Sequence, residues 1–274
     1  MDVRTGDRSA TAGGTASGAD ELASALRRSH DRLVAAVGTL TDEELTGPSY
    51  ADEWSVAQVL SHLGSGAEIF TSFLDAGLHG DPAPGGEQLR PVWDRWNAKT
   101  PRDQVHDALA ADAAFLDRLD ALGATERDGW RLPLFGTDQD LGGLLRMRLG
   151  EHAVHVWDVA VVSDGAATVA ADAVALLVDT LDGLVARSGQ PADRGLRVHV
   201  TTHGPDRSYL LEAGADGARL STVDSPPADV DAAIRLPAEA LLRLVYGRLD
   251  AEHTPRLASG HRDLDALRRV FPGF

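Results

Sequence analysis

The feature that most constrains the fold is a change in hydrophobic periodicity near residue 165. Before that point apolar residues recur every three to four positions, which is the spacing of amphipathic helices. After about residue 190, apolar and polar residues alternate in short runs between turn residues, as in strands. The sequence therefore predicts an α+β protein, with a four-helix bundle in residues 19–165 and a smaller α+β domain in residues 166–274.

The predicted bundle has clear helix start signals. Ser55 is a good N-cap with Gln58 at the third helical position, and Thr100 is a cap followed by Pro101 at the first helical position. The segment 125–140 is expected to be a loop. The helices expected in this half are 19–40, 56–74, 87–98, 101–122 and 141–162.

The second half is expected to begin with one helix over residues 168–188. Strand alternation follows in "LRVHVTT", "RSYLLEAG", "ARLSTV" and "AAIRLP". "AEALLRLVYGRL" and "RDLDALRRVF" are predicted helices, and "PRLASG" between them is strand-like. Residues 1–18, rich in Gly, Ser, Thr and Ala, are expected to form a disordered tail.

Composition excludes several classes of protein. No apolar run approaches the length of about 20 residues that a membrane span needs, and the N-terminus lacks the layout of a signal peptide. A net charge of −16 argues against nucleic-acid binding. We therefore expect a cytoplasmic protein without nucleic-acid or membrane partners. The chain has no cysteine, so His, Asp or Glu must hold any metal.

The segment "RLGEHAVHVWDVA" carries two histidines, one glutamate and one aspartate on an apolar, helix-favouring run. At helical spacing Glu151, His155 and Asp158 share one face, whereas His152 lies at least a quarter-turn away. Glu151 and His155 could present a carboxylate oxygen and an imidazole nitrogen to one divalent metal. The alternative is an exposed intrahelical pair, or a core histidine bonded to a carboxylate. A metal site needs at least one more ligand.

His62 is the remaining candidate ligand. It lies in mid-helix beside Leu60 and Leu63, on the stripe that faces the bundle core. A histidine there is either a hydrogen-bonded core residue or a ligand, and inward-projecting His and Glu side chains on facing helices are how bundles build metal sites. His199 is expected on the solvent face of a half-buried strand. Surface positions are expected for His79, His106, His203, His253 and His261.

Two of these motifs together resemble a known family. "EWSVAQVLSHL" (53–63), followed by "EHAVHVWDVA" (151–160), is similar to the metal-binding signature of the DinB-like superfamily, and more narrowly of the mycothiol-dependent maleylpyruvate isomerase family. "LLRLVYGR" (241–248) and the ending "LRRVFPGF" extend the resemblance to nearly all of the chain after residue 18. The resemblance implies a divalent metal, usually zinc, with His62, Glu151 and His155 as its ligands.

The chemistry of these residues supports an enzyme. Two imidazoles and one carboxylate form the open ligand set typical of catalytic zinc, and a thiol bound to the metal loses its proton near neutral pH. Because the chain has no cysteine, the sulfur must come from a small-molecule thiol, which the resemblance implies is mycothiol. We expect the thiolate to add to a small electrophile, giving either maleylpyruvate-type cis–trans isomerisation or S-transfer.

Two other functions compete with this expectation. Metal-activated water would make the protein a hydrolase, but the helix glutamate is itself the expected ligand, and Asp158 lies about one turn too far along to be the base. The C-terminal part resembles sterol-carrier-like domains, so a non-catalytic carrier of an apolar ligand with a structural metal is the alternative.

Three further residues have predicted roles. Asp158 either orients the imidazole of His155 through a hydrogen bond or ties the end of its helix to another. Arg248 is expected to reach the metal site from the second domain and hold a carboxylate of the substrate or thiol cofactor, as a catalytic and cofactor-binding residue. The competing interpretation of Arg248 is a surface salt bridge near Asp250 and Glu252. Trp54 is expected to staple the start of the following helix.

Overall fold

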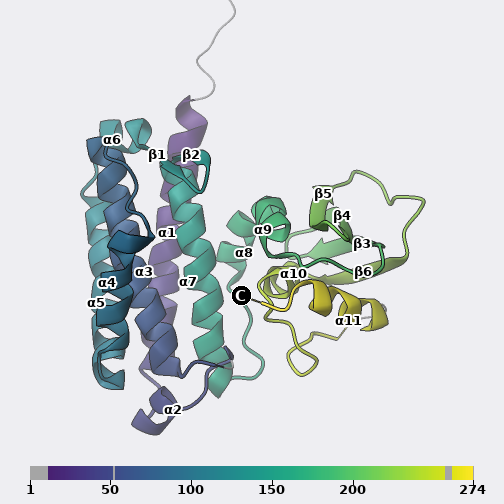
Figure 1. The fold of residues 1–274 in the computed structure, drawn as a ribbon, viewed down its shortest axis with the longest axis horizontal. Helices are drawn as coiled ribbons and strands as arrows, with labels where there is room; N and C mark the ends of the chain where they lie inside the picture. Colours follow the sequence, from purple (N-terminus) through teal and green to yellow (C-terminus); the bar gives the residue numbers. More distant parts are fainter. Residues whose placement is uncertain (1–11, 52, 257–260, 274) are drawn as a thin grey trace, which may run out of the picture. The chain divides into compact units, whose positions relative to one another are not determined.

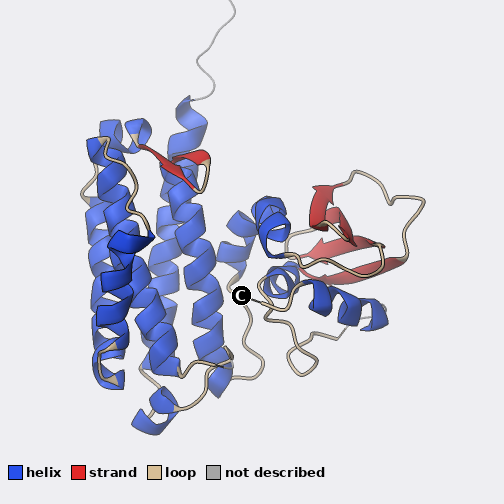
Figure 2. Cartoon of the chain, in the orientation of Figure 1, coloured by secondary structure: helices blue, strands red, loops and turns tan. Residues whose placement is uncertain are grey.

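The computed structural model of the chain describes residues 12–51, 53–256 and 261–273 (Figure 1). The chain divides into two compact units, Met1–Ala160 and Val161–Phe274. Figure 2 shows helices alone over most of the first unit, and a sheet with flanking helices in the second. The predicted class, a helical N-terminal region followed by an α+β region, is confirmed.

The first unit is built on four long helices. Its elements are α1 (Ala12–Val37), α2 (Asp42–Thr46), α3 (Val56–His79), α4 (Gly86–Asn97), α5 (Pro101–Asp120), α6 (Ala124–Gly129), β1 (Arg131–Leu134), β2 (Thr137–Asp140) and α7 (Leu141–Ser163). Helix α1 already begins inside the segment expected to be a tail, whose residues 1–11 lie outside the described residues.

Helix α3 begins at the predicted residue, Val56, but continues to His79, beyond the predicted end at residue 74. The Ser55 hydroxyl accepts a hydrogen bond from the Gln58 amide at 3.2 Å, and the Gln58 side chain accepts one from the Ser55 amide at 2.8 Å, which makes a capping box. The helix ends at Gly80, whose φ of 72° lies in the left-handed region that glycine adopts without steric cost. These caps fix the register of α3 and therefore the height of His62 in the bundle.

The core of the first unit lies between the long helices. It is made of buried aliphatic side chains and one indole, among them Leu33, Val56, Leu60, Leu63, Trp96, Val105 and Val159. The ring of Trp96 lies directly on Gly64, where a Cβ atom would be 2.3 Å from the indole. None of the described helices combines the length and the apolar content that a membrane span requires.

The prediction of a loop over residues 125–140 is wrong. This region contains the short helix α6 and an antiparallel hairpin of β1 and β2, so the first unit is not entirely helical. The turn between them has positive φ at Phe135 (51°) and Gly136 (83°), as two-residue hairpin turns require. Each strand has four residues, and only Leu132 and Leu134 are buried, so the alternation was too short to detect.

The second unit consists of a four-stranded sheet and helices. Its elements are α8 (Ala171–Leu177), the 3-10 turn η1 (Val178–Thr180), α9 (Leu181–Ser188), β3 (Leu196–His203), β4 (Arg207–Gly214), β5 (Gly217–Thr222), β6 (Ala232–Pro237), α10 (Ala238–Val245) and α11 (His261–Val270). The strand order is β5-β4-β3-β6, with β3 and β6 parallel and the other pairs antiparallel.

Two predicted helices of this unit differ in the structure. The expected helix 168–188 is interrupted at η1, where the Tyr209 hydroxyl donates to the carbonyl of Val178 at 3.1 Å. Helix α10 ends at Val245, because Gly247 has a φ of 72° and lies against the backbone of Gly273. Most of the strand-like "PRLASG" lies outside the described residues.

Candidate metal centre

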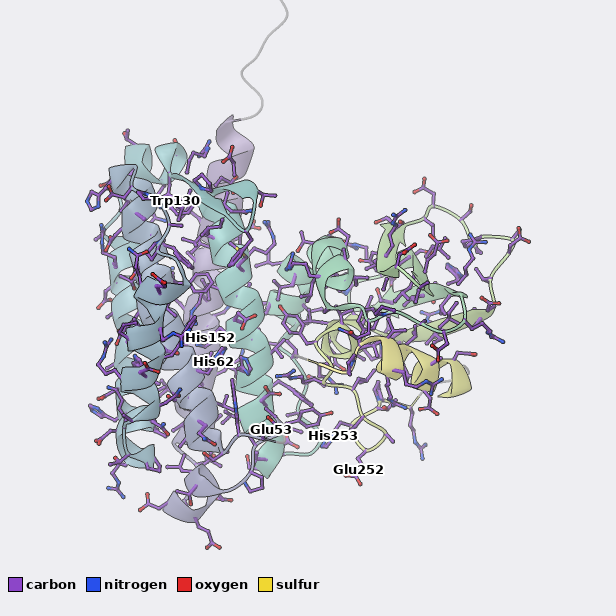
Figure 3. The ribbon with its side chains drawn as sticks, in the orientation of Figure 1. Glu53, His62, Trp130, His152, Glu252 and His253 are labelled. Atoms are coloured by element: carbon purple, nitrogen blue, oxygen red, sulfur yellow. The ribbon has the colours of Figure 1, made fainter. Side chains whose placement is uncertain are left out.

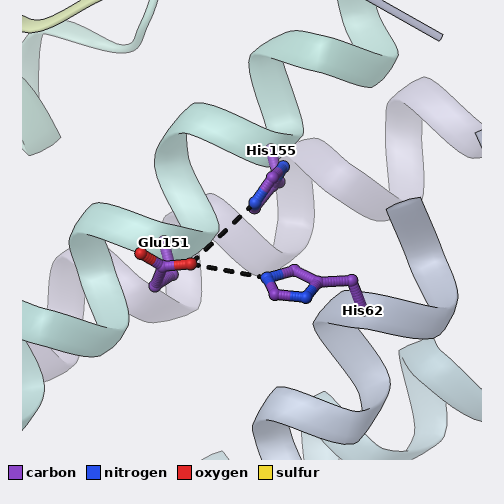
Figure 4. A group of neighbouring side chains, drawn as sticks. All are labelled: His62, Glu151 and His155. Carbon is purple, nitrogen blue, oxygen red and sulfur yellow. Dashed lines mark hydrogen bonds and ion pairs between the residues drawn. The ribbon is translucent and has the colours of Figure 1, made fainter. Parts of the chain in front are cut away.

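The structure brings His62, Glu151 and His155 together inside the first unit. His62 comes from α3, and Glu151 and His155 come from successive turns of α7, as Figure 4 shows. The Nε2 atom of His62 lies 3.4 Å from Oε2 of Glu151, and Nε2 of His155 lies 3.9 Å from the same oxygen. One ligand atom from each residue lies within 4.8 Å of the other two.

These separations fit a single metal ion. Zinc binds nitrogen and oxygen donors at about 2.0 to 2.2 Å, so two ligands of a tetrahedral ion are about 3.4 Å apart. The observed 3.4 and 3.9 Å are close to that value. The side chains of His62 and Glu151 are each 35% exposed, so the site is open to a small molecule. The donor set thus suits a divalent ion with a coordination position left for an exogenous ligand.

Asp158 fixes the orientation of His155. Its Oδ2 lies 2.8 Å from Nδ1 of His155, and the carboxylate is fully buried. When Nδ1 donates to this oxygen, the lone pair of the imidazole is on Nε2, which is the atom that faces Glu151. This contact is the first of the two roles considered for Asp158.

The electrostatics of the site also suit a cation. Burial lowers the pKa of His62, which leaves its imidazole neutral at neutral pH. Burial by itself would raise the pKa of Glu151, but the hydrogen bond with His62 and the nearby His155 and Arg148 outweigh burial and lower it. Neutral imidazole and ionised carboxylate are the forms that a metal ion binds.

Trp54 lies beside the candidate ligands, which its interpretation as a helix staple did not anticipate. The centroid of its ring is 5.2 Å from that of His62 and 6.3 Å from that of His155. The two imidazole rings are themselves 4.7 Å apart. The sequence signal was its place in the motif "EWSVAQVLSHL", eight residues before His62 and next to the cap of the same helix.

His152 belongs to a separate buried network. Its Nδ1 lies 2.8 Å from the Ser29 hydroxyl, and its Nε2 lies 2.9 Å from Oδ2 of Asp112. Asp112 also accepts a hydrogen bond from Nη2 of Arg148 at 2.8 Å and pairs with Nδ1 of His30 at 2.8 Å. Figure 3 labels His152 and His62 at similar heights in the bundle. These contacts turn the imidazole of His152 away from Glu151.

The roles of His30 and Asp112 in this network were not predicted from the sequence. A signal was present for Asp112, a lone carboxylate within the apolar run "ALAADAAFL" on the inner side of its helix. Such a group must be paired when buried, so it indicated a polar network in the bundle core. The identity of its partners depends on α1 and α7, which no local pattern specifies.

Arg248 lies in the second unit, just past the end of α10, whereas the three candidate ligands lie in the first. Arg248 is only 8% exposed, which does not fit a surface position. Its Nη1 donates to the carbonyl of Tyr246 at 2.7 Å, and its backbone amide donates to the carbonyl of Arg243 at 2.7 Å. The guanidinium is therefore held by the turn that Gly247 makes.

Comparison with known proteins agrees with this architecture. Two solved structures match with a TM-score of 0.65 and 12% sequence identity, covering 89% of this chain and 94% of the other. They are the mycothiol-dependent maleylpyruvate isomerase and a variant of it with one histidine changed to alanine. At this identity the likeness concerns the fold. No curated protein matches the sequence.

A family model gives the more specific result. The model described as the mycothiol maleylpyruvate isomerase N-terminal domain matches residues 26–160, a range that contains His62, Glu151 and His155. Residues 26–160 are therefore identified as a mycothiol maleylpyruvate isomerase N-terminal domain.

Proposed function

We propose that the protein is a metal-dependent enzyme that uses a small-molecule thiol, mycothiol, as the nucleophile toward a small electrophilic substrate. The observation that carries this proposal is the convergence of His62, Glu151 and His155 on the open side of a domain of this family. The reaction is maleylpyruvate-type cis–trans isomerisation or transfer of the sulfur group to the substrate.

The chain's residues would divide the work as follows. His62, Glu151 and His155 hold a divalent ion, for which zinc is the best match to two nitrogens and one oxygen. When bound, the ion lowers the pKa of a thiol, so that thiolate is present at neutral pH. Asp158 keeps the Nε2 lone pair of His155 directed at the ion. The absence of cysteine means that the chain supplies no thiol of its own.

The reaction class balances without an oxidant or reductant. The thiolate sulfur forms a bond to an electron-poor alkene carbon, and the alkene electrons move onto the conjugated carbonyl oxygen. The former double bond is now single and rotates. Return of the electrons re-forms the double bond, breaks the carbon–sulfur bond and releases the trans isomer with the thiolate. If the enolate carbon instead takes up a proton, the thioether remains and the outcome is S-transfer.

We propose further that Arg248 binds a carboxylate of the substrate or thiol. Its guanidinium is held in place by the carbonyl of Tyr246, and an arginine so fixed can bind a carboxylate with two parallel hydrogen bonds. Lysine keeps the charge but not the paired donors, so Arg248→Lys should raise KM more than tenfold. Steady-state kinetics at varied thiol and substrate check this, and an unchanged KM for both would remove Arg248 from the proposal.

The main test combines metal analysis with thiol-dependent turnover. Purified protein loaded with zinc should isomerise maleylpyruvate, or consume another electrophile, only when mycothiol is added. His62→Ala should lose both the metal and the activity, whereas His106→Ala, which removes a surface imidazole, should keep both. Full turnover without any thiol would refute the mechanism. Tight metal binding with no thiol binding would favour a carrier protein with a structural metal.

A further inference from the structure

Trp54 is placed unlike the other tryptophans near the bundle core. Trp96, Trp130 and Trp157 are almost fully buried, whereas Trp54 is 36% exposed. Its indole nevertheless lies beside the imidazoles of both His62 and His155. Packing against the core does not account for a large aromatic side chain that keeps about a third of its surface exposed to solvent in this position.

The loop that carries Trp54 is firmly held. The carbonyl of Trp54 accepts hydrogen bonds from the amide and the hydroxyl of Ser49, both at 2.9 Å, and its amide donates to the carbonyl of Ala51 at 2.7 Å. The next residue, Ser55, caps α3. The backbone of Trp54 is therefore fixed relative to the helix that carries His62.

The same loop is also bonded to α7. The amide of Tyr50 donates to the carbonyl of Asp158 at 3.3 Å, and the ring of Tyr50 packs edge-on against Trp157 with 4.6 Å between centroids. Contacts to both α3 and α7 set the indole against the pair of helices that supply the candidate ligands. The exposed part of the indole is thus kept at the open side of the site rather than left to move freely.

We propose that the indole of Trp54 forms one wall of the open coordination position and contacts the sulfur of the thiol bound there. This inference rests on the proposed function. Sulfur makes favourable contacts with aromatic rings at about 5 Å, whereas oxygen and nitrogen anions gain less from an apolar wall. Such a wall also limits water at the metal, which strengthens binding of the thiolate. Trp54 would therefore select sulfur ligands over other anions.

The test uses the full chain loaded with Co²⁺ and titrated with 2-mercaptoethanol and, separately, with azide. Thiolate bound to cobalt gives a charge-transfer absorption, so binding is read without any assay of activity. The variants are Trp54→Ala and the conservative Trp54→Phe. Trp93→Ala is the matched control, because Trp93 is similarly exposed, at 41%, but lies on α4. Co²⁺ should also quench tryptophan emission less in Trp54→Phe than in the wild type.

The expected result is specific for sulfur. Trp54→Ala should bind one Co²⁺ per chain but weaken 2-mercaptoethanol binding about three- to tenfold, with azide affinity changed less than twofold. Trp54→Phe should recover part of the loss, and Trp93→Ala should match the wild type. Equal thiol affinity in Trp54→Ala and wild type would overturn the inference alone. A wild type that binds Co²⁺ without any thiolate absorption would overturn the proposed function as well.

Discussion

The single contact that most shapes the chemistry of the candidate site is the one between His155 and Asp158. The 2.8 Å separation of their Nδ1 and Oδ2 atoms determines which imidazole nitrogen is free to bind a metal. A buried carboxylate in this position also increases the basicity of the imidazole. Asp158 itself is fully buried and contributes through His155.

Replacing Asp158 should therefore weaken metal binding without removing a ligand. For Asp158→Ala we expect metal affinity to fall about 10- to 100-fold, and for Asp158→Asn, whose amide oxygen can still accept the proton of Nδ1, to fall less. Competition with a chromophoric chelator measures both affinities. Asp107→Ala, at an exposed carboxylate of α5, is the control and should have no effect. An Asp158→Ala protein with wild-type affinity would show that the hydrogen bond has no role in binding.

At this scale the sequence predicted the grouping but not its surroundings. Helical spacing placed Glu151 and His155 on one face, and the structure brings His62 to them as the motif resemblance implies. The contacts of Trp54 with His62 and His155 were not predicted, because they depend on the path of an irregular loop that has no sequence periodicity. The pairing of His30 was not predicted, because its partner Asp112 lies 82 positions away in the sequence.

At the scale of secondary-structure elements, Asp112 joins three helices. It lies on α5, pairs with His30 on α1, and accepts hydrogen bonds from Arg148 and His152 on α7. The Arg148 guanidinium also donates to the carbonyl of Leu63 on α3 at 3.1 Å. This network lies inside the bundle, where removing one member leaves buried charge without its partner.

Asp112→Asn should lower the free energy of unfolding by about 3 to 5 kcal/mol, because the charge of Arg148 stays buried without its counterion. Urea denaturation measures the change. The matched control is Asp42→Asn, which removes a carboxylate whose pair with Arg102 is exposed, and it should cost less than about 1 kcal/mol. Similar losses in the two variants would show that the buried network contributes no more than a surface pair.

Asp112 should also make the stability of the protein sensitive to acid. Burial by itself would raise the pKa of Asp112, but His152, His30 and Arg148 outweigh it and hold the pKa well below its usual value. A carboxyl whose pKa is depressed in the fold contributes stability above its unfolded pKa of about 4, and that stability is lost as pH falls below it. Wild type should therefore lose stability below about pH 4 more steeply than Asp112→Asn. Parallel pH profiles would contradict this.

The elements themselves were predictable where local chemistry specifies their ends. The capping box at Ser55 and the cap at Thr100 correctly predicted the first residues of α3 and α5. The hairpin of β1 and β2 was missed because four-residue strands offer too little alternation. The break between α8 and α9 was missed because neither Gly nor Pro marks it, and the Tyr209 side chain that contacts it is distant in the sequence.

At the scale of the whole molecule, the two units can be observed separately. All five tryptophans, at positions 54, 93, 96, 130 and 157, lie in the first unit. Tryptophan emission therefore reports unfolding of the unit that contains the candidate metal centre, whereas the sheet of the second unit has none.

Zinc should raise the unfolding midpoint seen by tryptophan emission. A ligand at 100 times its dissociation constant adds about 2.7 kcal/mol to the free energy of unfolding. His62→Ala should show no such rise at the same zinc concentration. Thermal scans with and without zinc, followed by emission, check both. A wild-type midpoint that does not respond to zinc, cobalt or manganese would argue against the metal centre.

The two helices that supply the candidate ligands are far apart along the chain, and this has a consequence for its connectivity. His62 and Glu151 are separated by 89 positions, so an ion held by both would close a loop of that size. In the chain-entropy description, a cross-link closing such a loop disfavours the unfolded ensemble by about 4 to 5 kcal/mol. In a chain without cysteine, this would be a cross-link indifferent to reducing agents and removable by chelation, so the persistence of the fold would follow metal supply rather than redox state.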